Sequence, residues 1–256
     1  MSMQLPESVK VIKKEGNRAT FEIGPLMPGY GPTIANPLRR VLLSSLEGSA
    51  VTSVKISGID HEFTAIPNIL EDVIQVVLSL KQLRFKSYSP EPIIVKLEAK
   101  GEKAVTGADI ILHSDVELIN PGQHICTITN KKGAIDMELT IQRGRGYLST
   151  EQREKEKLPI GVIAIDAIFS PVRLVNFSID DVRVGDRIDF HRITMEIETD
   201  GSVQPEFAIQ EASRILKEHF DLISQIRVPE AEEKPEKSEK KPKRVSKKIV
   251  EDVDKE

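Results

Sequence analysis

The chain has 256 residues, of which 39% are hydrophobic and 30% are charged, and its formal net charge is −4 from 36 basic and 40 acidic residues. This composition indicates a soluble globular protein with ample length for a core, and it excludes a protein that binds nucleic acid through its overall charge. The single cysteine, Cys126, excludes disulfides and cysteine-based zinc sites within one chain. No stretch approaches the roughly 18 apolar residues of a membrane span, and the first residues do not resemble a signal peptide. We therefore expect a cytoplasmic protein.

The N-terminal part predicts a strand, a turn and a second strand, followed by a helix. Apolar residues alternate from residue 9 and again from 19 to 23, with turn-forming residues at 13–17. Residues 31–46 then read GPTIANPLRRVLLSSL. At about 100° per residue, one broad apolar stripe forms on this helix. The stripe consists of Ile34, Leu38, Val41, Leu42 and Leu46.

The ends of this helix leave two alternatives. It begins at Thr33 and is bent by Pro37, or Asn36 and Pro37 are the N-cap and first residue of a shorter helix. Glu47 and Gly48 end it, with Gly48 free to adopt the left-handed conformation that closes helices.

The middle of the chain is predicted to consist mainly of strands. Residues 51–64 indicate strands around Ser57 and Gly58, and 93–141 alternate in the same manner. The nearly continuous apolar run 160–169 predicts a strand buried on both faces, and the charged residues 149–157 a loop or an exposed helical turn. A second amphipathic helix is expected from about 67 to 83, with an inner stripe of Ile69, Leu70, Val73, Val77 and Leu80.

The C-terminal part predicts strands at 172–179 and 187–199 and a long helix from about 205 to 226. The helix carries Ile209, Ala212, Leu216, Phe220 and Ile223 on one face, and Ile215 and Leu222 widen that stripe. Such surplus width on two helices suggests a partner surface. Residues 229–256 contain nine basic and nine acidic residues and three prolines. We expect this tail to be disordered.

These elements predict an α+β protein. Two wide-striped helices bracket a central block of strands, which indicates one domain built from both chain ends with the middle inserted as a second unit.

Few residues indicate catalytic or metal chemistry. The five histidines (His61, His113, His124, His191 and His219) lack the spacing of metal ligands, and His124 with Cys126 would need further ligands. Glu71 and Asp72 fit the first turn of a helix better than a pair of acid–base carboxylates. We predict no catalytic, cofactor-binding or metal-binding residues and no cofactor.

Two arginine-containing motifs are candidate binding sites. Residues 143–147, RGRGY, follow a strand ending at Gln142 and are read as a glycine-bent surface loop, a protein contact or, least favoured, a phosphate-binding loop. Arg39 and Arg40 lie on the back of the first helix beside Leu43, which gives that helix a small docking patch. The basic run 240–244 is flanked by acids and is read as solvated.

Several motifs in order resemble the alpha subunit family of bacterial DNA-directed RNA polymerase. They are TIANPLRRVLLSSLEGSAVTSVKISGIDHEF at 33–63, VTGADI at 105–110, QRGRGY at 142–147, FSPV at 169–172 and EIETDG at 196–201. The likeness covers roughly residues 9–226. It implies a discontinuous dimerisation domain of residues 1–46 and 173–228, an insert domain of residues 47–172, and the tail 229–256.

The resemblance also implies partners. It assigns Ile34, Leu38, Val41, Leu42, Leu216, Phe220 and Ile223 to a homodimer interface. It assigns Arg39, Arg40 and Leu43 to contacts with the beta subunit. Contacts with the beta-prime subunit are expected within 172–192. The expected function is an assembly scaffold for the nucleotidyltransferase, non-catalytic itself and reaching DNA only through the complex.

The chain departs from the family pattern at two places. Pro37 replaces a common alanine, and we expect no C-terminal DNA-binding domain because only the charged tail follows residue 228. Two alternatives are kept: a self-standing homodimeric nucleic-acid-binding protein, and a small-molecule enzyme with a site between the domains.

Overall fold

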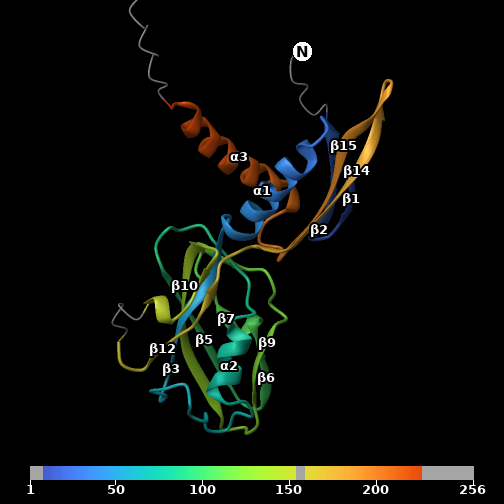
Figure 1. Ribbon diagram of the computed structural model, residues 1–256. Helices are drawn as coiled ribbons and strands as arrows, with labels where there is room; N and C mark the ends of the chain where they lie inside the picture. Colours follow the sequence, from blue (N-terminus) through green and yellow to red (C-terminus); the bar gives the residue numbers. More distant parts are fainter. Residues whose placement is uncertain (1–7, 154–158, 227–256) are drawn as a thin grey trace, which may run out of the picture.

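The computed structural model describes residues 8–153 and 159–226, and these form two large hydrophobic cores, one above the other in Figure 1, and a small third cluster of Ala50, Ala167 and Phe169. The helices are α1 (Tyr30–Ser44), α2 (Val73–Leu80) and α3 (Pro205–Ser224), with short 3₁₀ turns η1 (Gly107–Asp109) and η2 (Glu151–Arg153). The strands are β1 (Ser8–Glu15), β2 (Arg18–Leu26), β3 (Glu47–Ile56), β4 (Phe85–Ser87), β5 (Ile93–Lys100), β6 (Lys103–Thr106), β7 (Ile110–Ile111), β8 (Val116–Leu118), β9 (His124–Ile128), β10 (Ala134–Arg145), β11 (Tyr147–Leu148), β12 (Val162–Ala164), β13 (Ala167–Ile168), β14 (Val172–Val184) and β15 (Arg187–Thr199).

The first core lies between α1, α3 and an antiparallel sheet made from both chain ends. Its strand order is β1-β2-β15-β14, so that the second strand of the chain pairs with the last. Phe21 pairs with Met195 and Ile23 with Ile193, and all four side chains are buried against the helices. The alternation at residues 19–23 and 193–197 therefore decided which face the helices cover.

The second core lies in the middle of the chain. A sheet with the order β7-β5-β10-β3-β4-β8, to which β12 adds on β3, packs with α2 and the β6-β9 pair. The predicted alternation is confirmed in β5 and β10. Val95, Leu97, Ala99, Ile135, Met137, Leu139 and Ile141 are all buried.

Both predictions for the ends of α1 need correction. The helix begins at Tyr30, three residues before the predicted start at Thr33, and it contains Pro37, so the shorter helix capped by Asn36 is wrong. Asn36 instead donates its side-chain amide to the carbonyl of Pro32, 3.0 Å away. The helix ends at Ser44, and Gly48 lies within β3 without a left-handed φ. Glycine is required at 48 because a Cβ there would lie 1.9 Å from the Phe169 carbonyl oxygen.

Three predictions in the middle of the chain also fail. The second helix is restricted to α2, because residues 67–72 form a turn, with Asn68 at φ 62°, followed by bends and by β-bridges at Ile69 and Asp72. The strand β3 ends at Ile56, and no second strand follows Gly58 before residue 64. The apolar run 160–169 forms the short strands β12 and β13, in which buried and more exposed residues alternate, so it is not buried on both faces.

The charged segment 149–157 contains the predicted helical turn as η2. Residues 154–157 of that segment, the tail 229–256 and its basic run 240–244 lie outside the described residues.

Candidate protein-contact surfaces

Helix α1 has a core face and an exposed face, as its sequence predicts. Ala35, Leu38 and Leu42 are buried in the first core. Arg39 and Arg40 are exposed on the other side, and 36% of Leu43 is exposed. Neither arginine side chain forms an ion pair or hydrogen bond with any residue of 8–153 or 159–226. Two guanidinium groups and an apolar side chain are therefore open to a partner.

Both ends of α1 are fixed by residues from distant strands. At its start, the Gly31 amide donates to Nδ1 of His191 from β15, at 3.3 Å. A Cβ on Gly31 would lie 2.9 Å from that nitrogen, so glycine permits the approach. At its end, the Ser170 hydroxyl donates to the carbonyl of Leu43, at 3.0 Å. These contacts hold the arginine face at a fixed angle to the sheet.

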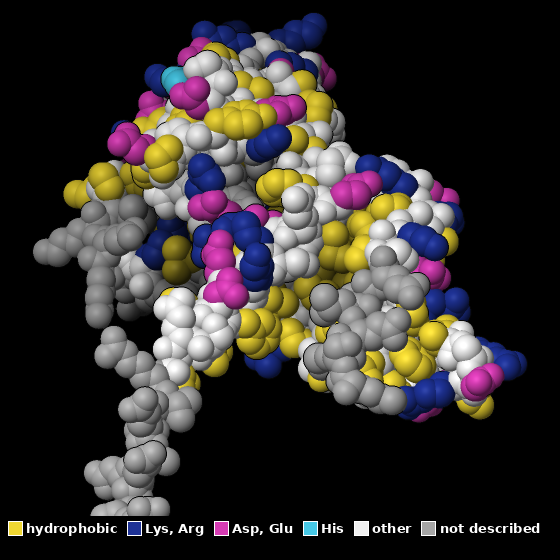
Figure 2. Space-filling model, turned by 90° about the horizontal axis from the view of Figure 1, so that it is seen from above, with side chains coloured by type: hydrophobic (Ala, Val, Ile, Leu, Met, Phe, Trp, Pro, Cys, Tyr) yellow, Lys and Arg dark blue, Asp and Glu magenta, His cyan; other side chains and the backbone are white. Residues whose placement is uncertain are grey.

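Helix α3 is buried only in its first half. Ala208 and Ala212 pack in the first core, whereas 59% of Phe220 and 61% of Ile223 are exposed. In Figure 1, the end of α3 projects away from the sheet. Figure 2, which looks down on this end of the molecule, shows hydrophobic side chains on the surface among charged ones.

A groove of about 260 Å³, the α1–α3 groove, runs between the two helices. It is lined by Thr33, Ile34, Pro37, Leu38, Ser213, Leu216, Lys217 and Phe220.

The residues expected at a dimer interface therefore divide into three groups. Leu38 and Leu42 are already buried within the single chain, with 6% and 0% exposed. Ile34, Val41 and Leu216 are half-buried and pack against the first core. Phe220 and Ile223 are exposed, and so are Leu222 and Ile226 on the same end of α3. The sequence analysis placed Leu222 only at the edge of the apolar stripe of this helix, and it did not select Ile226.

The RGRGY motif is not a separate loop. Arg143, Gly144 and Arg145 belong to β10, which extends three residues beyond the predicted end at Gln142. Gly146 turns the chain with φ 66° into β11, and Tyr147 is exposed. A Cβ at Gly144 would lie 2.7 Å from the Phe169 ring, so this glycine serves packing.

Glu71 and Asp72 have separate structural roles. Asp72 caps α2 by accepting the Gln75 amide at 2.7 Å. Glu71 accepts the Thr127 amide at 2.6 Å and lies 3.0 Å from Nε2 of His124, tying α2 to β9. Burial raises the pKa of Glu71, but the hydrogen bonds of His124 and Thr127 outweigh it and hold this pKa below its ordinary value.

The candidate ligand pair of β9 does not share one exposed face. His124 is exposed, and Cys126 is fully buried, where burial and the charges of Glu71 and Asp109 raise the pKa of its thiol to about 12. Within the described residues, no three His, Cys, Asp or Glu side chains gather as a metal-ion site.

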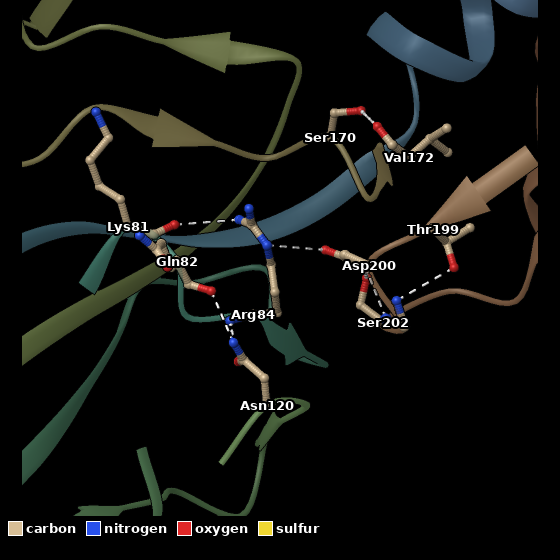
Figure 3. A network of polar contacts seen from close by, with 10 residues as sticks. Lys81, Gln82, Arg84, Asn120, Ser170, Val172, Thr199, Asp200 and Ser202 are labelled. Atoms are coloured by element: carbon tan, nitrogen blue, oxygen red, sulfur yellow. Dashed lines mark hydrogen bonds and ion pairs between the residues drawn. The ribbon is translucent and has the colours of Figure 1, made fainter. Parts of the chain in front are cut away.

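A polar contact between the two cores escaped the sequence reasoning. Arg84 follows α2 and Asp200 follows β15, and Nε of Arg84 lies 3.9 Å from Oδ2 of Asp200 (Figure 3). Burial lowers the pKa of Arg84 while Asp200 raises it, and the net effect is a lowered pKa. Asp200 also accepts the amide and hydroxyl of Ser202, at 2.9 and 2.6 Å. No local pattern marks two residues that are 116 positions apart and in different elements.

None of the helices formed by residues 8–153 and 159–226 is long and apolar enough to cross a membrane.

Comparisons with known proteins agree with the motifs. The family described as "RNA polymerase Rpb3/RpoA insert domain" matches residues 54–170. DNA-directed RNA polymerase subunit alpha of Symbiobacterium thermophilum is 45% identical over 224 residues, which covers 87% of this chain and 71% of the relative. The subunit of Desulforudis audaxviator is 48% identical (82% and 66% covered), and that of Alkaliphilus oremlandii is 41% identical (99% and 81% covered). The predicted family is confirmed, and the chain belongs to the alpha subunits of bacterial DNA-directed RNA polymerase.

Proposed function

We propose that this chain is the assembly scaffold of the polymerase, a homodimer that recruits the beta and beta-prime subunits in the cytoplasm. In this proposal the catalytic chemistry and the contact with DNA belong to the assembled complex, and this chain positions the other subunits relative to one another. The observation that carries the proposal is the unburied apolar end of α3, which lies next to the α1–α3 groove of its own chain.

The dimer contact follows from these two features. A twofold axis brings the same surface of each copy together, so the α3 end of one copy can enter the groove of the other and receive the same in return. Phe220 and Ile223 supply the apolar area, and Ile34, Val41 and Leu216 line or adjoin the receiving side. Leu38 and Leu42 contribute to the dimer contact indirectly, because they are buried in the first core and hold α1 on its sheet.

The beta subunit is assigned to the opposite side of α1. Arg39, Arg40 and Leu43 face away from α3 and the core, so one helix serves the dimer and the larger partner at once. The beta-prime subunit is assigned to residues 172–192, which include the long β14 strand at the edge of the sheet. Edge strands offer unpaired backbone groups to a partner.

The same proposal divides the chain at the cores. The first core draws its residues from 19–46 and 172–212, and the second from 51–165. This supports a dimerisation domain of residues 1–46 and 173–228 around an insert domain of residues 47–172.

Size-exclusion chromatography with light scattering tests the dimer. The wild-type chain is expected at twice the mass of one chain, and Phe220→Asp at the mass of one chain, because a carboxylate cannot be buried in an apolar groove without a partner. Phe63→Asp is the matched control, since Phe63 is 78% exposed in the insert and does not line the α1–α3 groove. A monomeric wild type, or equal dissociation by both variants, contradicts the proposal.

A further inference from the structure

A second cavity lies where the two cores meet. It has a volume of about 290 Å³, and we call it the junction pocket. Its lining comes from the segment after α1, from β3, β4 and the end of β10, from residues just before β14 and just before α3, and from the first three turns of α3. None of the predicted dimer or beta-contact residues lines it.

The β10 side of the pocket is basic. Arg143 and Arg145 are two residues apart on β10, so their side chains share one face of the sheet. Their partners on β3 are Ser49 and Glu47, and Arg145 stands directly opposite Glu47. Nη2 of Arg143 donates to Oε2 of Glu47 at 2.5 Å. Glu47 is therefore already engaged by one arginine.

The α3 side of the pocket presents Phe207, Glu211 and Arg214, which lie on one helical face at i, i+4 and i+7. Arg214 forms ion pairs with Glu211 and Glu218. A hydrogen bond from Arg214 lowers the pKa of Glu211 despite its burial, and the charge of Arg145 contributes to the same direction. Phe207 is 57% exposed, so a ring edge is available beside these charges.

The charges of the lining do not cancel. Arg143 is paired with Glu47, and Arg214 with Glu211 and Glu218, so the two lining cations that form no ion pair within the described residues are Lys86 and Arg145. Arg145 has no ion pair or side-chain hydrogen bond within residues 8–153 and 159–226. An unengaged guanidinium at the mouth of a positively charged cavity favours an oxyanion that can accept its paired N–H groups.

We propose that the junction pocket binds a small organic phosphate, meaning a phosphomonoester attached to a flat apolar group. A phosphomonoester carries about −1.5 to −2 charges at neutral pH, which matches these two cations better than a single carboxylate does. Arg145 and Lys86 hold the phosphate, and the apolar part lies against Phe207. The volume is near the lower limit of roughly 300 Å³ for ligand pockets, so there is room for more than the phosphate.

Binding would also stabilise the folded arrangement of the two cores. The β3 and β10 walls extend from the sheet of the second core, and the α3 wall belongs to the first. A ligand that contacts both walls is expected to raise the unfolding temperature in a concentration-dependent manner, because it binds only the folded arrangement.

Isothermal titration of the full chain with adenosine monophosphate, inorganic phosphate and adenosine tests the proposal. We expect the monophosphate to bind most tightly, phosphate more weakly and adenosine not measurably. Arg145→Gln should weaken the monophosphate by at least about tenfold, because it removes a charge-assisted hydrogen bond. Lys131→Gln is the control, since it removes the same charge from an exposed side chain outside the pocket and should change the affinity less than about twofold.

Phe207→Ala separates the two parts of the ligand. It should reduce the affinity for adenosine monophosphate to that for phosphate and leave phosphate unchanged. The proposal is overturned if neither anion saturates the chain at millimolar concentration, or if Arg145→Gln and Lys131→Gln weaken binding equally. If phosphate binds as tightly as the monophosphate, the claim that the pocket also binds a flat apolar group is refuted. The dimer plays no part in this site, so a negative result leaves the proposed function standing.

Discussion

Phe169 makes glycine necessary at two neighbouring positions, Gly48 on β3 and Gly144 on β10. At Gly48 a Cβ would meet backbone, and at Gly144 it would meet the Phe169 ring, which can shift. Gly48→Ala is therefore expected to lower the free energy of unfolding by about 1–3 kcal/mol, and Gly144→Ala by less. Urea denaturation measures both. Gly122→Ala is the control, because nothing lies within 4 Å of its Cβ position, and an equally large loss there would argue against crowding as the cause.

Asp166 is the residue whose ionisation contributes most clearly to stability. Its carboxylate accepts the Thr150 amide at 2.9 Å and the Lys81 ammonium at 3.0 Å, and these contacts lower its pKa from 3.8 to about 2. Because the pKa is depressed in the folded state, the stabilisation is complete above the unfolded pKa and is lost as the pH falls through the folded one.

Asp166→Asn should therefore cost about 1–2 kcal/mol at neutral pH, and the difference from wild type should vanish as the pH falls from about 4 to about 2. Urea unfolding across this range measures it. Asp60→Asn, at an exposed aspartate that forms no ion pair in the described residues, is the control. A difference that persists unchanged at pH 2 would mean that the ionisation of Asp166 is not its source.

The elements differ in how far they depend on their surroundings. Helix α1 continues through Pro37 because residues on both sides of the proline, Ala35 and Leu38, are buried against the sheet, and this packing outweighs the missing backbone hydrogen bond. Helix α2 is shorter than its apolar pattern, because Glu71 ties its start to β9 and Asp72 caps it there. Leu70, predicted in the inner stripe, is exposed.

The two faces of α1 lead to a test at this scale. Arg40→Ala should leave the dimer intact and weaken the capture of the beta subunit by at least about tenfold, because the exposed guanidinium forms no ion pair or hydrogen bond with the described residues of its own chain. Co-purification with tagged beta subunit, together with sizing of the variant, measures both properties. Lys131→Ala removes an exposed cation from the insert and serves as the control. If Arg40→Ala captured the beta subunit as well as wild type does, Arg40 would not be part of the beta-subunit contact.

In the whole molecule, the Arg84–Asp200 ion pair is one of the contacts between the two cores. Within the described residues it is the one ion pair that joins them, and Asp200 is nine-tenths buried. Beside it, a Cβ on Gly201 would lie 2.8 Å from Asn17 and 3.0 Å from Ile119, so the two units meet closely here. The junction therefore holds the surfaces of α1 and α3 at a fixed angle to the insert.

Arg84→Met should lower the free energy of unfolding by about 1–3 kcal/mol, because it leaves the Asp200 carboxylate buried without its cation. It should also speed amide hydrogen exchange at Ile119 and Gly201 beyond the change seen elsewhere. Arg18→Met, which breaks the exposed pair with Glu196, is the control and should cost less than about 1 kcal/mol. Uniformly faster exchange would indicate global destabilisation instead of a loosened junction.

The sequence by itself determined the strands β2, β5, β10 and β15, the face that each of them buries and the presence of the two long helices, because apolar alternation such as that of Phe21, Ile23, Ile193 and Met195 is a local property of the chain. It also identified the family and selected Arg40 as an exposed residue. Only the tertiary structure decided that Leu38 and Leu42 are buried within a single chain, whereas Phe220 and Ile223 are exposed. It likewise brought Arg84 to Asp200. These outcomes depend on contacts between residues far apart in the sequence, and short-range periodicity carries no information about such contacts.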